Sequence, residues 1–576
     1  MNKISPRPCS DRLVQQLIAG GVPPLLARLY AARGITDAGQ LDTGLQHLLP
    51  FALLKNAQQM GKQLADAIGA DKRILIVADY DADGATACAV GMRGLGALGA
   101  RVDFIVPNRF EYGYGLTPEI VQLSRQSSPD ILLTVDNGIA SVEGVAEAHR
   151  LGMQVLVTDH HLPGDTLPEA ECIVNPNQSG CAFPSKHLAG VGVMFYVLMA
   201  LRAELRKRGA FEPVEVSPTP SPSPAGRGEP NLGHLLDLVA LGTVADVVKL
   251  DDNNRILVQQ GLQRIRAGHG CCGVQALLRV ARRPAAQTSS YELGYMLGPR
   301  LNAAGRLEDM SIGIRCLLTD DANEADELAT RLDALNHERR SIEADMQESA
   351  LATLHAFDPA DNFSLALFNA DWHQGVIGIL ASRLKDKFHR PVIAFARAQN
   401  GELKGSGRSI PGLHLRDALD LVSKRQPHLI LKFGGHAMAA GLSIAEAHLA
   451  DFRMAFEAVA RELLDADALQ KTITTDGALE VHEFTLDIAR SLQNQVWGQG
   501  FPEPLFEGDF HVQAQRVVGE KHLKLKLSSP AGNFDAIRFF SAEPVAENIR
   551  AVYSLNINEY NGSENLQLIV RHWQKA

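Results

Sequence analysis

The sequence predicts an α/β protein of several domains: a parallel-sheet domain, a long helix, a smaller α/β domain and a C-terminal β-barrel. Between residues 73 and 160, short apolar runs alternate with helical segments, which is typical of a parallel sheet covered by helices. The stretch 320–357 contains no glycine and repeats its leucines at helical spacing. Residues 466–576 contain short runs in which polar and apolar side chains alternate, as they do along strands.

Length and charge limit the possible functions. A chain of 576 residues exceeds one ordinary domain, and its net charge of −10 argues against nonspecific coating of nucleic acid or anionic membranes. A locally basic groove is compatible with that net charge, so the charge does not exclude an enzyme that acts on nucleic acid. The sequence shows no apolar stretch that would span a bilayer and no secretory signal at residues 1–10. Its 7 cysteines include no CxxC pair, which indicates reduced thiols and a cytoplasmic protein.

Four apolar runs predict the strands of the first sheet. Each is short and rich in β-branched residues, as expected for a strand buried on both faces. The runs are 74–78, 102–106, 130–135 and 154–158, with helices expected at 85–98 and 141–151. The glycines of 94–100 fit a dinucleotide-binding fingerprint, but that motif should open a helix and here it closes one. We therefore interpret it as a glycine-capped helix end.

Metal-type side chains follow three of the predicted strands. Asp81 and Asp83 follow the first, Asp136 follows the third, and His160 and His161 follow the fourth. Ligands of such sheets bind beyond the carboxyl ends of the strands, so these side chains are expected to share one site. An aspartate after a strand is more often a turn or helix cap, but capping has no reason to recur with this chemistry.

A further carboxylate, Asp246, lies inside the apolar segment 239–248. A buried carboxylate must be paired or coordinated, and the alternative is a capping role beside Thr243. Several carboxylates with one or two imidazoles favour Mn²⁺ or Mg²⁺ over zinc, and the histidines favour manganese. Four or more carboxylates indicate two ions bridged by a shared aspartate, an arrangement that catalyses displacement at phosphorus.

Phosphate-binding side chains are also present. Asn108 and Arg109 follow the second strand, and the segment 300–306 places Arg300, Asn302 and Arg306 among small residues. Arginine binds phosphate with two parallel hydrogen bonds, although an isolated surface arginine is more often only solvated. The residues together predict a metal-dependent phosphoester hydrolase.

These motifs resemble those of the DHH phosphoesterase superfamily, whose signature stands here as Asp159-His160-His161. Within it, the chain resembles the bacterial single-stranded-DNA-specific exonucleases from about residue 50 to the C-terminus. The segments that carry this resemblance are 79–84, 107–109, 113–115, 135–138, 241–246 and 300–306. The segment 434–441 resembles the signature of the associated DHHA1 domain.

The resemblance implies roles for individual residues. The metal ligands it implies are Asp81, Asp83, Asp136, His160 and Asp246, whereas Asp79 either ligates or only orients the loop. His161 would contact the scissile phosphate. The substrate-binding residues would be Asn108, Arg109, Arg300, Asn302 and Arg306, with Ser406, Arg408 and His436 in the second α/β domain. His436 is either a substrate contact or a turn histidine.

The expected domains are an N-terminal extension, a DHH catalytic domain, a connecting helix, a DHHA1 domain and an OB-like nucleic-acid-binding domain. Their expected boundaries are 1–50, 51–319, 320–357, 358–465 and 466–576. Proline and serine at 217–230 predict a solvated, disordered insert in the catalytic domain. The helix would be on the order of 50 Å long. The lysines of 522–527 either bind single strands or protect an edge strand from aggregation.

The resemblance implies a 5′→3′ exonuclease that hydrolyses single-stranded DNA to 5′-mononucleotides with two Mn²⁺ or Mg²⁺ ions, in DNA repair and recombination. It implies single-stranded DNA with a 5′ end as substrate, a single-strand-binding protein and a helicase as partners, no membrane, and a cytoplasmic monomer. One alternative is a phosphodiesterase of dinucleotides or short oligoribonucleotides, against which the long helix and the C-terminal strands argue. The other is a non-catalytic replication scaffold, against which the complete ligand set argues.

Overall fold

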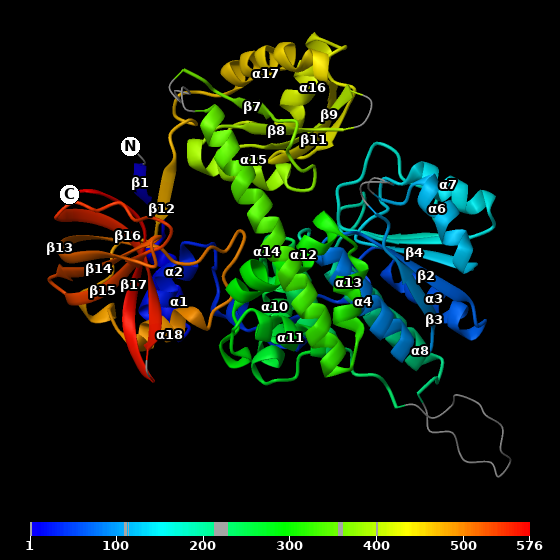
Figure 1. The fold of residues 1–576 in the computed structure, drawn as a ribbon. Coiled ribbons are helices and arrows are strands. Elements are labelled where there is room, and N and C mark those ends of the chain that lie inside the picture. The colour runs from blue at the N-terminus through cyan, green and yellow to red at the C-terminus, as the bar shows by residue number, and fades with distance from the viewer. Residues whose placement is uncertain are drawn as a thin grey trace. The chain divides into compact units, whose positions relative to one another are not determined.

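The computed structural model describes residues 3–108, 112, 115–211, 228–354, 361–398, 401–560 and 562–576. Arg109 and most of the predicted insert lie outside the described residues. The chain forms two compact units (Figure 1). The smaller unit comprises Met1–Ser5 and Ala334–Thr474, and the larger comprises Pro6–Asp333 and Thr475–Ala576.

The first sheet of the larger unit has five parallel strands in the order β3-β2-β4-β5-β6. The strands are β2 (Arg73–Ala78), β3 (Arg101–Ile105), β4 (Ile131–Val135), β5 (Gln154–Thr158) and β6 (Cys172–Val174). The four predicted strands are confirmed, and β6, with three residues, was too short to stand out in the sequence. The strand order reverses between β2 and β4, and in such sheets ligands bind at the reversal.

Helices cover both faces of this sheet (Figure 1). On one face, Leu75 and Val77 of β2 share a core with α6 (Pro118–Ser124) and α7 (Val142–Arg150). The other face packs against α4 (Ala82–Ala97) and α8 (Gly190–Lys207), and α3 (Ala57–Gly69) packs on α8. The glycine-rich segment at 94–100 ends α4, and Gly99 has a φ of +97°, so the predicted glycine cap is confirmed.

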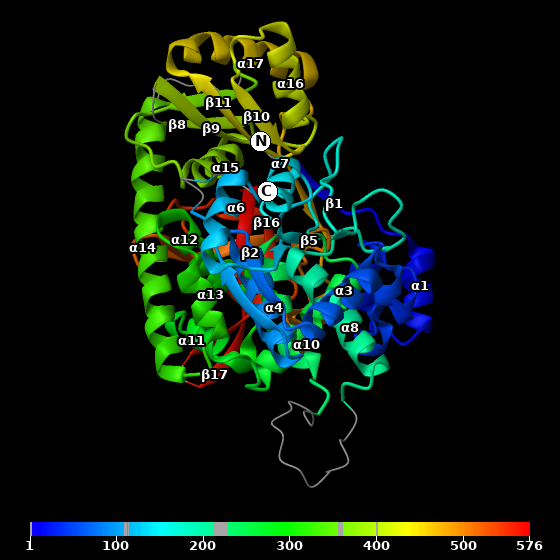
Figure 2. The ribbon, with the colours of Figure 1, turned by 90° about the vertical axis from the view of Figure 1, so that its right-hand side faces the viewer.

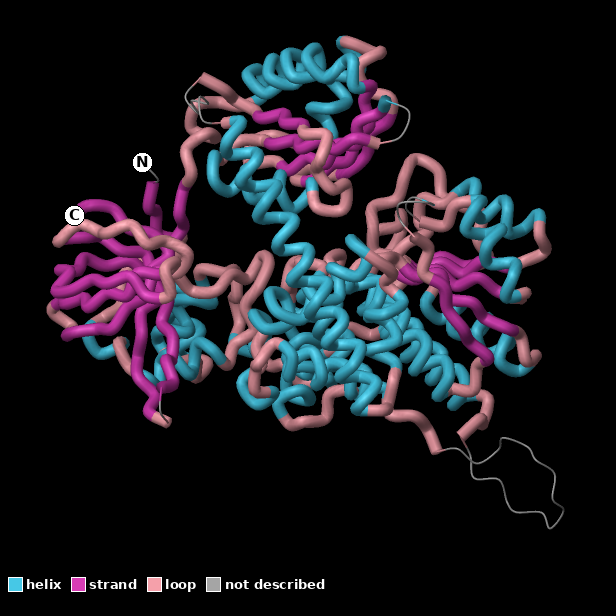
Figure 3. Tube along the Cα trace, in the orientation of Figure 1, coloured by secondary structure: helices cyan, strands magenta, loops and turns pink. Residues whose placement is uncertain are grey.

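Between β6 and β7 the described chain contains helices and no strand (Figure 3). The helices after α8 are α9 (Leu236–Ala245), α10 (Asp252–Arg266), α11 (Cys272–Val280), the π-helical segment η7 (Glu292–Leu297), α12 (Gly298–Leu307), α13 (Ser311–Leu318) and α14 (Ala322–Thr353). The predicted long helix is confirmed as α14, one continuous helix in Figure 2. None of the described helices is both long and apolar enough to cross a membrane.

The smaller unit contains a mixed sheet in the order β10-β11-β9-β8-β7. Its strands are β7 (Leu365–Phe368), β8 (Val392–Arg397), β9 (Glu402–Arg408), β10 (Lys432–Gly435) and β11 (Ala439–Ala445), and its helices are α15 (Ile377–Phe388), α16 (Leu415–Arg425) and α17 (Leu449–Leu463). Only β7 and β8 pair in parallel. Phe395 of β8 and Phe452 and Phe456 of α17 lie in its core, so the second α/β domain is confirmed.

The C-terminal residues form a closed five-stranded barrel in the order β13-β14-β15-β17-β16. Its strands are β13 (Phe506–Val518), β14 (His522–Ser529), β15 (Gly532–Arg538), β16 (Asn548–Tyr560) and β17 (Ser563–Lys575), preceded by α18 (Leu486–Gln493). Leu523, Leu525 and Leu527 are buried while Lys526 is exposed, which confirms the alternation. Because β14 pairs with strands on both sides, it is no edge strand, and the edge-protection alternative for its lysines is wrong.

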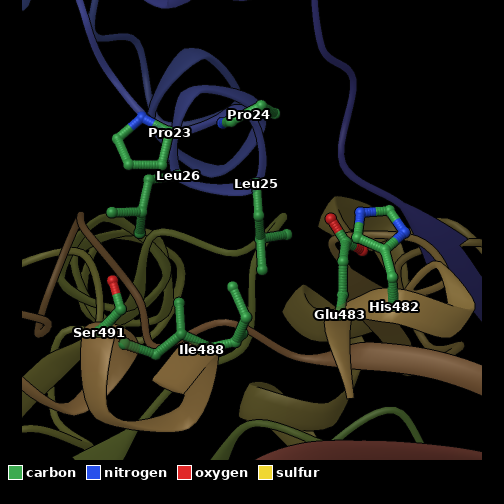
Figure 4. A pocket seen from close by; sticks show the side chains of 9 residues that line it. Pro23, Pro24, Leu25, Leu26, His482, Glu483, Ile488 and Ser491 are labelled. Atoms are coloured by element: carbon green, nitrogen blue, oxygen red, sulfur yellow. The ribbon is translucent and has the colours of Figure 1, made fainter. Parts of the chain in front are cut away.

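Residues 3–50 are folded. Strand β1 (Lys3–Pro6) pairs with β12 (Thr472–Thr475), and the helices α1 (Asp11–Ala19) and α2 (Pro24–Ala31) follow. Figure 4 shows a pocket lined by Leu25 and Leu26 of α2 and by Ile488 and Ser491 of α18. The predicted N-terminal extension therefore packs, in the larger unit, beside the helix that precedes the barrel.

Candidate metal centre

The first three carboxylates lie in the loop between β2 and α4 and in the first turn of α4. Asp81 caps α4, and its Oδ1 accepts hydrogen bonds from the backbone N–H of Asp83 (2.9 Å) and of Gly84 (3.0 Å). A Cβ at Gly84 would lie 2.5 Å from the carbonyl oxygen of Asp79, so only glycine permits so tight a turn. One oxygen of Asp81 therefore does cap the helix, as the alternative interpretation of this aspartate predicted. This capping contact holds the loop at the end of β2.

Asp83 is buried and joins the loop to α8. Its Oδ2 accepts from the Gly190 N–H (2.6 Å) and its Oδ1 from the Val191 N–H (2.9 Å), at the N-terminus of that helix. Burial, and next the charge of Asp81, raise the pKa of Asp83 to about 7. The two backbone donors do not offset the free-energy cost of burying this carboxylate beside that of Asp81. A bound cation would lower that cost.

Asp136 follows β4 with a left-handed backbone, φ +62°. The Asn137 side chain donates to the carbonyls of Val77 (3.1 Å) and Val135 (2.9 Å), which ties the ends of β2 and β4 together. A Cβ at Gly190 would lie 2.5 Å from Asp136 Oδ1, so α8 can approach this carboxylate only through a glycine. The strain and close packing indicate a side chain fixed for function.

One imidazole nitrogen lies among the carboxylates from the other segments. His160 Nε2 is 3.1 Å from Asp136 Oδ1, 3.5 Å from Asp246 Oδ2 and 3.9 Å from Asp83 Oδ2. Asp246 reaches this point from the C-terminal end of α9. The structure thus brings together the side chains that the sequence places after β2, β4, β5 and α9.

Three overlapping sets of ligand atoms have all their members within 4.8 Å of one another. The sets are Asp136, His160 and His161; Asp83, His160 and Asp246; and Asp79, Asp81 and Asp136. Burial first, and then the charge of Asp83, raise the pKa of Asp136 and of Asp246 well above the ordinary value. Buried Asp136 Oδ1 faces His160 Nε2 at 3.1 Å without hydrogen-bond geometry. A cluster of carboxylates with imidazole fits a divalent cation of the Mn²⁺ or Mg²⁺ type.

Asp159 has a role that the sequence reading missed. Its Oδ1 lies 2.7 Å from His161 Nδ1 and accepts the backbone N–H of His160 (2.7 Å), and its Oδ2 accepts the N–H of Ile139 (2.9 Å). Burial alone would lower the pKa of His161, but the hydrogen bond with Asp159 raises it to about 9. Asp159 therefore orients His161 and favours its cationic form. In the sequence, only the position of Asp159 in the Asp159-His160-His161 signature indicated such a role.

Two asparagines after β6 were also missed. Asn175 donates to the His161 carbonyl (2.9 Å) and Asn177 donates to the His160 carbonyl (2.6 Å). These asparagines follow β6 and hold the backbone of the two histidines. Strand β6 is too short to be recognised in the sequence as a hydrophobic run. No local pattern in the sequence marks such a contact.

The predicted phosphate-binding residues of this unit differ in their surroundings. Arg300 is held by Asp333 (2.9 Å from Nε) and by the Met296 carbonyl (2.7 Å), and Asn302 accepts the Ala82 N–H (2.9 Å). Both therefore brace α12 or the β2–α4 loop. A Cβ at Gly305 would lie 1.9 Å from the Tyr80 carbonyl oxygen, so the adjacent Arg306 lies beside the β2–α4 loop, here called the carboxylate loop. Asn108 is exposed after β3.

A second group of predicted residues lies in the smaller unit. Ser406 and Arg408 are neighbours on one face of β9, where Arg408 Nη1 donates to Ser406 Oγ (3.3 Å) and to the Gly407 carbonyl (2.8 Å). Burial lowers the pKa of Arg408. His436 is exposed in the turn between β10 and β11, and Ala439, which starts β11, pairs with Arg408. The turn histidine and the arginine thus lie at the same end of this sheet.

Three family descriptions match the chain in succession. Residues 73–243 match the N-terminal domain of the DHH family, residues 361–462 match the DHHA1 domain, and residues 475–572 match the RecJ OB domain. The three matches follow the first sheet, the mixed sheet and the barrel of the structure.

Relatives and solved structures agree with these matches. The chain is 50% identical over 563 residues to the single-stranded-DNA-specific exonuclease RecJ of Dickeya dadantii, covering 96% of each chain. The crystal structure of RecJ from Thermus thermophilus in complex with Mn²⁺ superimposes with a TM-score of 0.81 at 29% identity, covering 100% of this chain and 79% of that one. Its complex with Mg²⁺ gives a TM-score of 0.76 at 29% identity, covering 100% and 78%. The chain belongs to the RecJ family.

Proposed function

We propose that this protein is a single-stranded-DNA-specific exonuclease that removes 5′-mononucleotides in the 5′→3′ direction. The observation that carries the proposal is the position of His160 Nε2, within 3.9 Å of carboxylate oxygens from Asp83, Asp136 and Asp246. These side chains meet at the carboxyl ends of β2, β4 and β5, where a parallel sheet binds its ligand. The relatives' names supply the substrate class.

The proposed ligands of two Mn²⁺ or Mg²⁺ ions are Asp79, Asp81, Asp83, Asp136, His160 and Asp246. Bound ions would lower the pKa of a water molecule for attack on phosphorus and neutralise charge on the phosphate. Two features support this assignment: backbone donors hold Asp81 and Asp83, and Asp136 has a left-handed backbone. Asp79 has the least defined role, since it either ligates or shapes the loop.

Other residues would hold the strand. His161, kept cationic by Asp159, would donate from its second ring nitrogen to an oxygen of the scissile phosphate. Arg306 and Arg109 would bind neighbouring phosphates, and Arg408 with Ser406 would bind the terminal nucleotide. Arg300 and Asn302 would act through α12 and the β2–α4 loop, because their side chains are engaged there. His436 remains either a substrate contact or a turn residue.

We also propose a role for each domain and two kinds of partner protein. Residues 51–319 would form the catalytic domain, 358–465 the terminal-nucleotide domain and 466–576 the strand-binding domain, joined by the helix of 320–357. A single-strand-binding protein and a helicase would supply and expose the substrate, and the protein would act as a cytoplasmic monomer in repair and recombination. Family membership supports this assignment.

The test uses long single strands labelled at either end, with Mn²⁺ present. We expect a 5′ label to appear as a mononucleotide from the first turnovers, while a 3′ label stays on a shortening strand. Duplex DNA of the same sequence should be resistant. Cleavage of dinucleotides alone would instead identify a small-substrate phosphodiesterase, and the absence of any cleavage by protein with bound Mn²⁺ would favour a scaffold.

A further inference from the structure

Two exposed tyrosines lie on the helical run that leads into α12. Tyr291 is 46% exposed and Tyr295 is 71% exposed. Their rings stack on one another, with centroids 5.0 Å apart and planes inclined by 30°. Within the described part of the chain, neither hydroxyl makes a hydrogen bond that would explain the pair. A stacked pair of exposed aromatic side chains offers a contact surface for another flat, apolar group.

Two glycines place this surface beside the metal centre. A Cβ at Gly294 would lie 3.2 Å from Val244 Cγ1, and a Cβ at Gly298 would lie 3.0 Å from the Cβ of Ala245. Both contacts fall on the last turn of α9, and the next residue is Asp246. The tyrosines alternate with these glycines along the chain, so they border the helix end that presents a proposed metal ligand.

The backbone here has features that stability alone does not explain. The tyrosines flank and enter a π-helical segment, a conformation that is rare and concentrated at functional sites. Its start is anchored because Ser290 Oγ donates to the Trp497 carbonyl (2.6 Å). Val247, directly after Asp246, is 62% exposed and has a φ of +62°, which is strained for a β-branched residue.

The chemistry of the two tyrosines and their place next to the proposed phosphodiester-cleaving centre indicate which class of ligand they bind. Unpaired bases stack on aromatic rings whatever their sequence, whereas paired bases are already stacked and covered. Arg306 lies on the same helical run, eleven residues or roughly 16 Å along the axis from Tyr295, beside the carboxylate loop. Rings for bases and a cation for phosphate thus lie on one helical run, which packs on the end of α9 at the glycines beside the tyrosines and on the Tyr80 backbone beside Arg306.

We propose that Tyr291 and Tyr295 form a stacking platform that holds unpaired bases of the substrate as the strand enters or leaves the metal centre. The inference rests on the proposed function for its substrate. It assigns to these residues part of the preference for single strands, since a base must leave its duplex partner to stack on Tyr295.

The experiment measures equilibrium binding of a fluorescent single strand to the full-length protein in EDTA, so that cleavage plays no part. Tyr295→Ala and the double variant with Tyr291→Ala are compared with the matched variants Tyr295→Phe and Tyr291→Phe, which keep the rings. We expect Kd to rise about tenfold for the alanine variants and to stay near the wild-type value for the phenylalanine variants. A strand of abasic nucleotides should remove most of the difference between wild type and alanine variants.

Three results would overturn the platform. One is unchanged Kd in the alanine variants, and another is an equal loss on the abasic strand. The third is altered self-association in sedimentation with unchanged DNA binding, which would identify a protein-contact surface. Matching melting temperatures show that the variants are folded, because both side chains are exposed. A wild-type protein that fails to release 5′ nucleotides would contradict the proposed function separately, since the binding assay needs no catalysis.

Discussion

The two α/β domains carry opposite charges at their candidate sites. In the first, the buried carboxylates of Asp83 and Asp136 and the half-buried carboxylate of Asp246 surround one histidine, and the pKa of each is raised, first of all by burial. In the second, Arg408 is half-buried and makes no ion pair with the described residues, and its pKa is lowered by burial. Each site holds partly or fully buried charge that the neighbouring side chains compensate only in part.

This difference teaches which partner each site requires. An uncompensated buried charge costs several kcal/mol, so it persists where a ligand of opposite sign binds. The first site therefore suits cations, and we propose that the second binds an anion such as a phosphate group. Removing charge should stabilise the ligand-free protein in both domains, while function should fail in different ways: catalysis in the first, substrate affinity in the second.

The largest expected effect comes from Asp136→Asn. Asparagine tolerates the left-handed backbone at φ +62°, so the variant removes charge without adding strain. We expect exonuclease activity with Mn²⁺ to fall by at least about 100-fold. In EDTA the variant should melt no lower than wild type, because a buried like charge is gone. A variant that keeps its activity would remove Asp136 from the site.

The second domain is tested by Arg408→Gln. Losing a charge-assisted contact of about 1.5–3 kcal/mol should raise KM roughly ten- to hundredfold with little change in kcat. Arg408→Lys keeps the charge but loses the planar fork, so it should lie between wild type and Arg408→Gln. Steady-state kinetics on 5′-phosphorylated strands measure the effect. A fall in kcat with constant KM would contradict the contrast between the domains.

A smaller effect is expected from crowding Asp136. The Cβ of Gly190→Ala would lie 2.5 Å from Asp136 Oδ1 and must displace the carboxylate or α8. We expect Mn²⁺ affinity in calorimetric titration to fall about tenfold. Gly69→Ala is the matched control, because a Cβ there would meet no atom within 4 Å. Equal affinities in the two variants would show that Asp136 needs no fixed position.

The smallest effect is a shift of stability with pH. Burial raises the pKa of Asp83 from 3.8 to about 7, so between these values the folded protein holds a proton that the unfolded chain has released. The stability of the protein in EDTA should therefore be greatest below pH 4 for this group and fall as pH rises toward 7. Asp136 and Asp246 act in the same direction.

Saturating Mn²⁺ should oppose this loss, because the cation replaces the proton. The gain in melting temperature from Mn²⁺ is then larger near pH 8 than near pH 5, as calorimetry can measure. A melting temperature in EDTA that rises steadily across this range would contradict the account of the carboxylate cluster.

Much of the first site was predictable because it follows from strand ends. Buried β-branched runs located β2, β4 and β5, and the rule for parallel sheets placed Asp81, Asp136 and His160 at one edge. Asp246 was predictable only as a charge in an apolar segment. That segment is a helix, α9, with the carboxylate at its end.

Other contacts could not be read from the sequence because they depend on tertiary packing. Asn175 and Asn177 follow a three-residue strand, and Asp333, which binds Arg300, lies 33 residues along the chain from it. The first fifty residues were expected to be an extension, whereas α2 packs against α18, more than 400 residues away. Only the folded chain reveals such pairs.

The central claim is that the carboxylate cluster holds the divalent ions of a nuclease. Diffraction from crystals grown with Mn²⁺, collected at the manganese absorption edge, tests it most directly. We predict two anomalous peaks, one of them within coordination distance of Asp136, His160 and Asp246, and their loss in Asp136→Asn. A cluster without anomalous density, or identical density in that variant, would contradict the account.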